Sequence, residues 1–189
     1  MSAQDSKLFV ISGPSGAGKG TLVTRVRERR SNLGLTVSAT TRAPRKGEAD
    51  GVNYFFLTRE EFDRRVANGE FVEWAEVHGN CYGTLVSEVT SKLASGSSLI
   101  LEIDVQGALQ VKERFPEAVL IFIKPPSLEV LRERLVGRGT ETPETIELRM
   151  ANAADELALA DRYDDVVVND DLDRATDELV RVLDMHERI

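Results

Sequence analysis

The segment from Gly13 to Thr21 is rich in glycine and follows the apolar run 8–11. It reads Gly-Pro-Ser-Gly-Ala-Gly-Lys-Gly-Thr. Glycines bring backbone N–H groups close to an anion, because no side chain blocks the approach and positive φ is accessible. Lys19 adds a positive charge, and a helix that starts here adds free N–H groups and the positive end of its dipole. The pattern predicts a strand, a phosphate-binding loop and a helix that hold a nucleoside triphosphate.

The position after Lys19 departs from the usual phosphate loop, which has Ser or Thr there as a ligand of Mg²⁺. This chain has Gly20, followed by Thr21. Contact with the metal then falls to Thr21, to water or to acidic residues elsewhere. The alternative is a glycine-rich turn that binds nothing. The lysine in register and the apolar run before the loop favour the phosphate site.

The composition is typical of one globular α/β unit, with 189 residues of which 41% are hydrophobic and 30% charged. The longest apolar run, 118–123, is too short to span a bilayer, which needs ~20 residues. Residues 1–7 lack the pattern of a secretion signal, so we expect a cytoplasmic protein without a membrane partner. The net charge of −8 argues against nucleic acid as a partner. Cys81 is the only cysteine, which excludes an internal disulfide.

Apolar strand patterns alternate with amphipathic helical patterns along most of the chain. The expected strands are 8–11, 35–39, 71–77, 98–104, 119–123 and 166–168. The expected helices follow the phosphate loop and then cover 58–69, 85–93, 128–135, 146–159 and 172–188, the first of these capped by Thr58 with Glu61. Such alternation predicts a parallel sheet with helices on both faces. Segments 40–85 and 135–150 interrupt the pattern, and we expect them over the phosphate loop, at the carboxyl ends of the strands.

Further motifs are spread over nearly the whole chain. They are SATTRAPR at 38–45, Gly47-Glu48, Tyr54, EWA at 73–75, GNCYGT at 79–84, LEIDVQG at 101–107, GRGT at 137–140 and NDD at 169–171. Together with the phosphate loop, they resemble the guanylate kinase family from about Phe9 to Leu172. The resemblance implies an α/β P-loop NTPase fold in a single domain. Its core (about 1–37, 86–125 and 156–189) would have a parallel sheet flanked by helices. The core would carry an inserted GMP-binding subdomain (about 38–85) and a mobile lid (about 126–155).

The resemblance also implies an activity, the Mg²⁺-dependent transfer of the γ-phosphoryl group of ATP to GMP and to dGMP, which gives ADP and GDP in purine nucleotide metabolism. ATP would be held by the phosphate loop and by Asn169, which matches a position near adenine and could equally cap the final helix. The implied loop contacts are Gly13, Pro14, Ser15, Gly16, Ala17, Gly18, Lys19, Gly20 and Thr21.

The phosphate of GMP would be held by residues that match Arg42, Arg45, Tyr54 and Tyr82, with Glu48 in the same set. The chemistry agrees, because two guanidinium groups three residues apart can grip a dianionic phosphate and phenolic hydroxyls add neutral donors. Each of these residues alone would more often be a packing or surface residue.

The base would be recognised by Glu73, Ser38 and Thr84. Guanine presents its N1–H and its N2 amino group side by side, and two such donors suit one carboxylate. The family places a Glu at the position of Glu73, and hydroxyls at the positions of Ser38 and Thr84 that address O6. A base site whose buried polar group is left unpaired by the wrong substrate can discriminate by ~10⁴ or more. The alternative for Glu73 is an exposed strand carboxylate.

Glu102 and Asp104 are two residues apart in an expected strand, so both side chains should point to one side near its carboxyl end. The family analogy assigns this pair to contacts with GMP and to support of Mg²⁺ through water. We expect Asp104 to lie nearer the metal, together with Thr21. A buried structural carboxylate is the alternative for one of the two.

The expected catalytic set is Lys19, Arg42 and the residues that match the family's lid arginines, Arg134, Arg138 and Arg149. Phosphoryl transfer spreads negative charge over the equatorial oxygens, which cationic groups stabilise. Two other interpretations stay open at this point. One is a non-catalytic guanylate-kinase-like module that binds phosphopeptides, and the other is a kinase for another nucleoside monophosphate.

Overall fold

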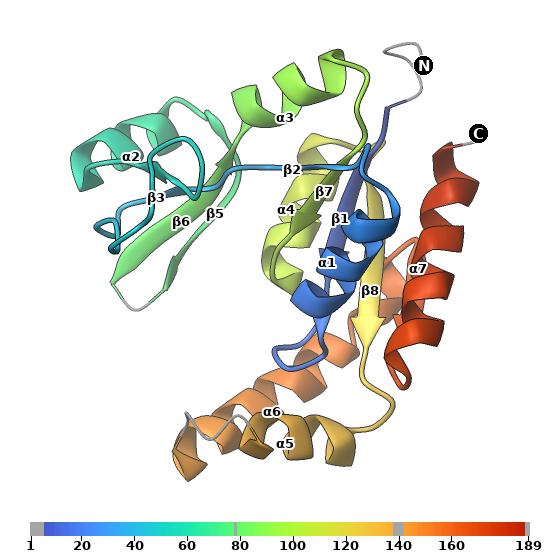
Figure 1. The fold of residues 1–189 in the computed structure, drawn as a ribbon. Helices are drawn as coiled ribbons and strands as arrows, with labels where there is room; N and C mark the ends of the chain where they lie inside the picture. The colour runs from blue at the N-terminus through green and yellow to red at the C-terminus, as the bar shows by residue number, and fades with distance from the viewer. Residues whose placement is uncertain (1–5, 78, 138–141, 188–189) are drawn as a thin grey trace.

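The computed structural model describes residues 6–77, 79–137 and 142–187. Its central sheet is parallel, with the strand order β2-β7-β1-β8-β9 (Figure 1). The strands are β1 (Leu8–Ser12), β2 (Gly34–Leu35), β7 (Leu99–Glu102), β8 (Val119–Lys124) and β9 (Asp165–Val168). The α/β architecture with a parallel core sheet confirms the predicted fold class.

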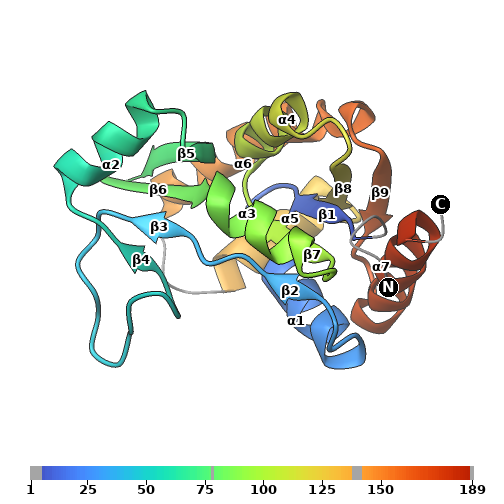
Figure 2. The same cartoon turned by 90° about the horizontal axis from the view of Figure 1, so that it is seen from above.

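Side chains of the central strands alternate between two buried faces, because successive residues of a strand point to opposite sides. Phe9 and Ile11 of β1 pack with α1 (Lys19–Arg29) and α7 (Leu172–Glu187). Leu8 and Val10 pack on the other face, with α3 (Val86–Ala94) and α4 (Val105–Arg114). Burial on both faces explains why these strands are continuous apolar runs. The layered arrangement is visible from above in Figure 2.

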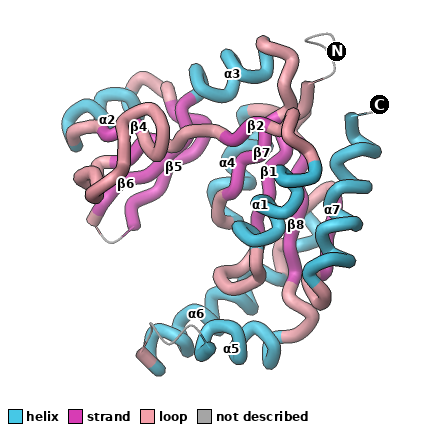
Figure 3. Tube along the Cα trace, viewed as in Figure 1, coloured by secondary structure: helices cyan, strands magenta, loops and turns pink. Residues whose placement is uncertain are grey.

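A second, smaller sheet lies to one side of the central sheet, with the order β4-β3-β6-β5 (Figure 3). Its strands are β3 (Ala39–Thr40), β4 (Phe55–Phe56), β5 (Phe71–Val77) and β6 (Asn80–Leu85). Its longest pairing is the antiparallel β5–β6 ladder. Helix α2 (Arg59–Ala67) covers it, and Phe62 is fully buried between the helix and the sheet.

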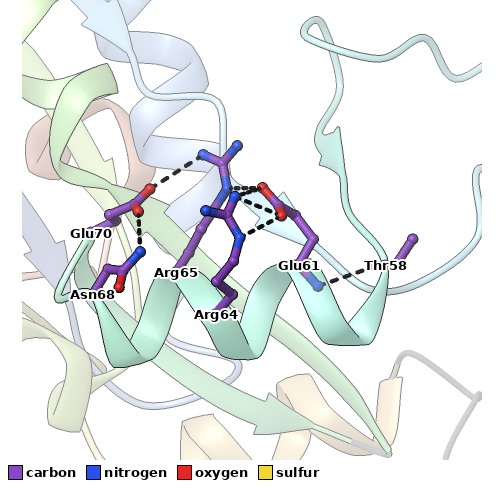
Figure 4. Close-up of polar contacts among 6 residues, drawn as sticks. All are labelled: Thr58, Glu61, Arg64, Arg65, Asn68 and Glu70. Atoms are coloured by element: carbon purple, nitrogen blue, oxygen red, sulfur yellow. Dashed lines mark hydrogen bonds and ion pairs between the residues drawn. The ribbon is translucent and has the colours of Figure 1, made fainter.

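Helix α2 begins at the predicted cap. The Thr58 hydroxyl accepts a hydrogen bond from the Glu61 N–H, which confirms the capping signal in the sequence. Along the exposed side of the helix, the Glu61 carboxylate accepts hydrogen bonds from Arg64 and Arg65 (Figure 4). Arg65 also reaches Glu70 beyond the end of the helix. These pairs stabilise a short helix that buries only one large side chain against the sheet.

Helices α5 (Leu128–Gly137) and α6 (Pro143–Leu157) pack against each other below the phosphate loop in the view of Figure 1. They have a small core of their own, with Leu131, Leu135 and Ile146. The turn η1 (Ala160–Arg162) then leads back to the central sheet. Among the described residues, no helix combines the length and apolar content that a membrane span needs.

Some expected elements differ from the structure. The prediction of a single strand at 35–39 is wrong. The structure has two short strands there, because β2 pairs in the central sheet and β3 pairs in the smaller one. The strand expected to reach Asp104 ends at Glu102, and Asp104 instead caps α4, a helix that the sequence patterns do not predict. Strand β6 is likewise absent from the predicted elements. The break between β2 and β3 is the point where the chain leaves the central sheet.

Candidate nucleotide-binding site

The glycine-rich segment forms a loop between β1 and α1. Gly13, Gly16 and Gly18 have φ values of 137°, 91° and 91°, a backbone conformation that residues with a side chain rarely adopt. At Gly13 the space is closed as well, because a Cβ atom there would lie 2.2 Å from the Ile123 carbonyl oxygen. The conformation of the loop therefore depends on glycine at these positions.

Helix α1 starts directly after Gly18, which has a left-handed conformation and provides no capping side chain. The first N–H groups of a helix have no partner within the helix, so this end is suited to an anion. The Lys19 ammonium group lies back over the loop and donates to the carbonyl oxygens of Gly13 at 2.6 Å and Pro14 at 3.1 Å. The positive charge is thus held at the loop that the sequence predicted to bind phosphate.

Two of the expected arginines contact the loop from the hairpin that α5 and α6 form. Arg134 of α5 donates to the Asn169 carbonyl oxygen at 2.8 Å and to that of Ala17 at 3.4 Å. Arg149 of α6 donates to the Ser15 hydroxyl. The third expected arginine, Arg138, lies outside the described residues. The guanidinium groups of Arg134 and Arg149 therefore border the loop. The α5–α6 hairpin that carries them lies below the loop in the view of Figure 1.

Asn169 is buried, with 5% of its surface exposed, and its side chain holds the loop. Its Nδ2 donates to the Ala17 carbonyl oxygen at 2.8 Å, and its backbone N–H donates to the Lys124 carbonyl oxygen at the end of β8. The cap of α7 is Asp171, whose carboxylate accepts from the Arg174 N–H. Asn169 is therefore a loop contact and does not cap the final helix.

A cavity of about 500 Å³ opens beside this arrangement. It is lined by loop residues together with the Arg134 and Asn169 side chains and Leu172 at the start of α7. A second cavity of about 310 Å³ covers the other side of the loop, where Lys19 and Thr21 meet Glu102 from the end of β7. The two cavities share Gly16, Gly18 and Thr21, so open space lies on both sides of the loop where it leads into α1.

In the smaller sheet, Arg42 forms an ion pair with Glu48. One guanidinium nitrogen donates to both carboxylate oxygens, at 2.9 and 3.0 Å, and Glu48 also accepts from the Arg45 N–H at 2.7 Å. The pKa of Glu48 is lowered, chiefly by the hydrogen bond from Arg42. The same bond raises the pKa of Arg42, with a smaller contribution from Tyr82.

Two aromatic rings lie beside the Arg42 guanidinium group. Its central carbon lies 5.4 Å from the centre of the Tyr54 ring and 5.9 Å from that of Phe56. Tyr54 and Tyr82 contact each other edge to face, with ring centres 6.2 Å apart. The structure therefore brings the expected phosphate-binding residues Arg42, Tyr54 and Tyr82 together, whereas Arg45 is exposed.

The Glu73 carboxylate is buried on the side of the smaller sheet that faces α4, with 7% of the residue exposed. Its pKa is raised to about 7, chiefly by burial and to a lesser degree by the negative charge of Asp104, whereas hydrogen bonding to Thr84 opposes the shift. Thr84 lies directly opposite Glu73 in the β5–β6 ladder. A buried carboxyl with these neighbours can recognise a group that donates hydrogen bonds.

A β-bulge aims Glu73 toward α4. The β5–β6 register shifts between Phe71 and Glu73. Phe71 and Trp74 both contact the Phe62 ring of α2, with ring centres 4.3 and 6.2 Å apart. Val72 packs with the central core. In a regular strand Phe71 and Glu73 would share a face, so the bulge moves Glu73 to the side of Val72.

Glu102 and Asp104 have different surroundings. The Glu102 carboxyl lines the smaller cavity, where burial raises its pKa and the charge of Lys19 opposes the shift. Asp104 accepts a hydrogen bond from the Gly107 N–H at 2.9 Å and caps α4. The expectation that both lie on one strand face is wrong, because β7 ends at Glu102.

A sequence model of the guanylate kinase family matches residues 5–186. The chain belongs to this family. A guanylate kinase of Gloeobacter violaceus is 56% identical over 178 residues, which cover 94% of this chain and 87% of that protein. One of Halalkalibacterium halodurans is 51% identical over 183 residues, with 97% and 90% coverage. The crystal structure of guanylate kinase from Anaplasma phagocytophilum aligns with a TM-score of 0.73 at 37% identity, over 96% of this chain and 86% of that one.

The sequence predicts no individual role for some residues of this guanylate kinase family member. Glu156, near the end of α6, has a pKa raised by burial, and it interacts with the charges of Lys19 and Asp104. Arg114 ends α4 and donates to the Phe71 carbonyl oxygen at 2.8 Å. Gly107 lies beneath the Glu73 carboxylate. Only Gly107 has a signal in the sequence, since it follows Asp104 at the spacing of a helix cap.

Proposed function

We propose that this chain transfers the γ-phosphoryl group of ATP to GMP, and to dGMP, with Mg²⁺ as cofactor. The observation that carries the proposal is the pairing of a phosphate loop containing Lys19 with a buried carboxylate, Glu73, in a separate sheet of the same chain. The loop serves one nucleotide, and the carboxylate recognises the other. Membership of the guanylate kinase family supports the assignment of these two roles.

ATP binds along the loop, with its phosphates on the N-terminal end of α1 and on Lys19. The larger cavity beside Arg134 and Asn169 takes the nucleoside. In this role Asn169 fixes the Ala17 carbonyl oxygen and so the shape of the loop. The Lys19 ammonium group exchanges its contacts with Gly13 and Pro14 for phosphate oxygens when the nucleotide enters.

The donors at the loop fit Mg²⁺, because Thr21 offers a hydroxyl and Glu102 a carboxylate around one cavity, and Mg²⁺ prefers oxygen ligands. Within the described residues, no group of three or more His, Cys, Asp or Glu side chains is arranged to hold a metal. This agrees with an ion that is held largely by phosphate oxygens and water. When bound, Mg²⁺ neutralises charge on the transferring phosphate. The role of Asp104 near the metal stays a prediction.

GMP binds to the smaller sheet. Arg42, Arg45, Tyr54 and Tyr82 hold its phosphate, and Glu48 holds Arg42 in place. Glu73 accepts from the N1–H and the N2 amino group of guanine, while Ser38 and Thr84 donate to O6. The Thr84 hydroxyl is buried beside the Glu73 carboxyl, whose pKa it lowers, so the two groups proposed to contact the base adjoin each other.

The chain's own residues then stabilise charge during transfer. The phosphate of GMP is already ionised, so no general base is required. Lys19, Arg42, Arg134 and Arg149 provide positive charge around the transferring group. In this proposal segment 38–85 is the GMP-binding subdomain and segment 126–155 is the lid. Their approach excludes water, which would otherwise accept the phosphoryl group.

The competing interpretations differ in what they retain. A phosphopeptide-binding module does not require the conformation of the phosphate loop or Lys19. This chain has both. A kinase for another nucleoside monophosphate would not need a carboxylate at the base. The acceptor base therefore separates the remaining possibilities.

The test is ADP formation by the purified chain with Mg·ATP and each of GMP, dGMP, AMP, UMP and CMP, with a control that lacks acceptor. We expect activity with GMP and dGMP, and a selective loss of both in Glu73→Gln. Equal activity with AMP would overturn the base assignment. Folded protein that binds GMP but forms no ADP with any acceptor would favour the binding module.

A further inference from the structure

Gly107 has a position in its helix that the backbone conformation does not explain. It is the third residue of α4, and its φ is not in the left-handed region that requires glycine. Glycine is less favourable than alanine inside a helix. Because conformation gives no reason for glycine here, the reason must lie in the space around the residue.

That space is occupied by the Glu73 carboxylate. A Cβ atom on Gly107 would lie 3.3 Å from Glu73 Oε2 and 3.3 Å from Ile103 Cδ1, and 3.7 Å from Asp104 Oδ1. The first two separations are shorter than ordinary van der Waals contact between such atoms. The helix backbone has little freedom to withdraw, since the Gly107 N–H is held by Asp104 at 2.9 Å.

The strand that carries Glu73 is held to the same helix at the other end. Arg114 donates from its guanidinium group to the carbonyl oxygens of Gly69 and Phe71, just before the bulge. Val72 packs in the same core cluster as Val105, Ala108 and Val111 of α4. Strand β5 therefore cannot move away from α4 to make room for a methyl group without losing these contacts.

We propose that Gly107 is a specificity-determining residue, because its missing side chain leaves the space in which the Glu73 carboxylate lies to read the edge of guanine. A side chain at this position displaces the carboxylate and weakens recognition of the base. The proposal rests on the proposed function, since it assigns Gly107 to the same base site. Gly107 acts through Glu73 and is a positioning residue.

The first variant is Gly107→Ala, measured by steady-state kinetics with GMP and with ATP. We expect KM for GMP to rise about tenfold, the size of a weakened charged hydrogen bond, while KM for ATP stays within about twofold. The preference for GMP over inosine monophosphate, which lacks the N2 amino group, should fall. The matched control is Gln106→Ala, an exposed neighbour in the same helical turn, which should leave all these values unchanged.

The second variant tests the contact itself. Glu73→Asp shortens the side chain by one methylene and withdraws the carboxylate from α4. If the methyl group that Gly107→Ala introduces acts by displacing this carboxylate, Glu73→Asp should cost less in the Gly107→Ala background than in the parent chain. The proposal is overturned if the change in KM for GMP in the double variant equals the product of the changes in the two single variants. The two positions would then act independently.

The outcomes separate this proposal from the proposed function. A parent chain that does not phosphorylate GMP contradicts the function itself. A parent chain that uses GMP, with Gly107→Ala unchanged in KM for GMP, overturns only the role of Gly107. If Gly107→Ala does not fold by circular dichroism, the double variant with Glu73→Asp replaces it. Recovery of folding and of GMP use then supports the proposal, and failure of both overturns it.

Discussion

One guanidinium nitrogen of Arg42 donates to both carboxylate oxygens of Glu48, and both side chains are partly buried, with 15% and 19% of their surfaces exposed. This pair fixes Arg42 beside the Tyr54 and Phe56 rings. A second bond, from the Arg45 N–H, fixes Glu48 in turn. The proposed phosphate-binding arginine is thus held in place before any ligand binds. This reduces the side-chain entropy that is lost on binding.

Glu48→Gln should therefore weaken GMP binding without touching ATP. The amide cannot accept from Arg42 with a full negative charge, so the guanidinium group becomes less well oriented. We expect KM for GMP to rise about tenfold with KM for ATP unchanged, measured by ADP formation. The control is Asp63→Asn, which removes an exposed ion pair of α2 with Arg59. A fall in KM for GMP would instead show that Glu48 competes with the phosphate.

Lys19→Met should lower kcat on the order of 10²–10³-fold, the typical effect of removing one group that stabilises charge in the transition state. Methionine keeps much of the length of the side chain and removes the ammonium group that now contacts Gly13 and Pro14. Thermal unfolding should be nearly unchanged, which separates loss of chemistry from loss of fold. Turnover close to that of the parent would contradict the assignment of the loop lysine.

GMP affinity should depend on the ionisation of Glu73. Its pKa of about 7 means that the free protein holds this carboxyl mostly protonated below pH 7. Since the proposed contact with both donors of guanine requires the ionised form, affinity should rise about tenfold for each pH unit up to 7 and then level off. The GMP phosphate also titrates in this range. Glu73→Gln keeps that titration, so the ratio of parent to variant affinity isolates the carboxyl, and a ratio independent of pH would contradict the prediction.

The same carboxyl makes folding stability depend on pH. The folded pKa lies above the ordinary value of 4.5, so the folded state binds more protons than the unfolded state between pH 4.5 and 7. Stability then falls as pH rises through this window, by about 3 kcal/mol for this group. Glu73→Gln removes the dependence. Urea unfolding at pH 5 and pH 8 should show a larger stabilisation by the variant at pH 8, and the opposite order would contradict the burial of this carboxyl.

Local sequence signals predict the parts of the site that depend on neighbours in the chain. The glycines of the loop, the place of Lys19 beside them and the Thr58 cap are set by conformations within a few residues, and the structure confirms each of them. The alternating apolar strands also predict the central sheet. The positions of Arg42, Tyr54 and Tyr82 in one cluster follow from the resemblance to a family and not from periodicity.

The parts that sequence does not predict depend on tertiary contacts. Phe71 and Trp74 share the Phe62 ring only because a bulge separates them, and nothing in the apolar pattern of 71–77 signals an extra residue. The run 35–39 has the pattern of a single strand, yet its two ends pair with different sheets. The apolar run before Asp104 hides the start of α4, so the pattern places this residue in a strand.

Asn169 provides a test of the loop that is independent of the GMP site. Its Nδ2 lies 2.4 Å from where a Cβ atom of Gly18 would be, and it donates to the Ala17 carbonyl oxygen, which Arg134 contacts at a longer distance. Asn169→Ala leaves that buried oxygen with only the weaker partner. We expect a loss of about 1–2 kcal/mol in unfolding free energy and a rise of about fivefold in KM for ATP. KM for GMP should not change, because the smaller sheet is untouched.

The control for Asn169→Ala is Asp173→Asn in the first turn of α7, an exposed residue that pairs with Arg25 away from the loop. It should leave both KM values unchanged and alter stability by no more than about 0.5 kcal/mol. Urea denaturation and ADP formation at varied ATP give both quantities for each variant. If Asn169→Ala changed stability but left KM for ATP unaltered, the side chain would only join the end of β9 to the loop. A rise in KM for ATP with unchanged stability would place Asn169 in direct contact with the nucleotide.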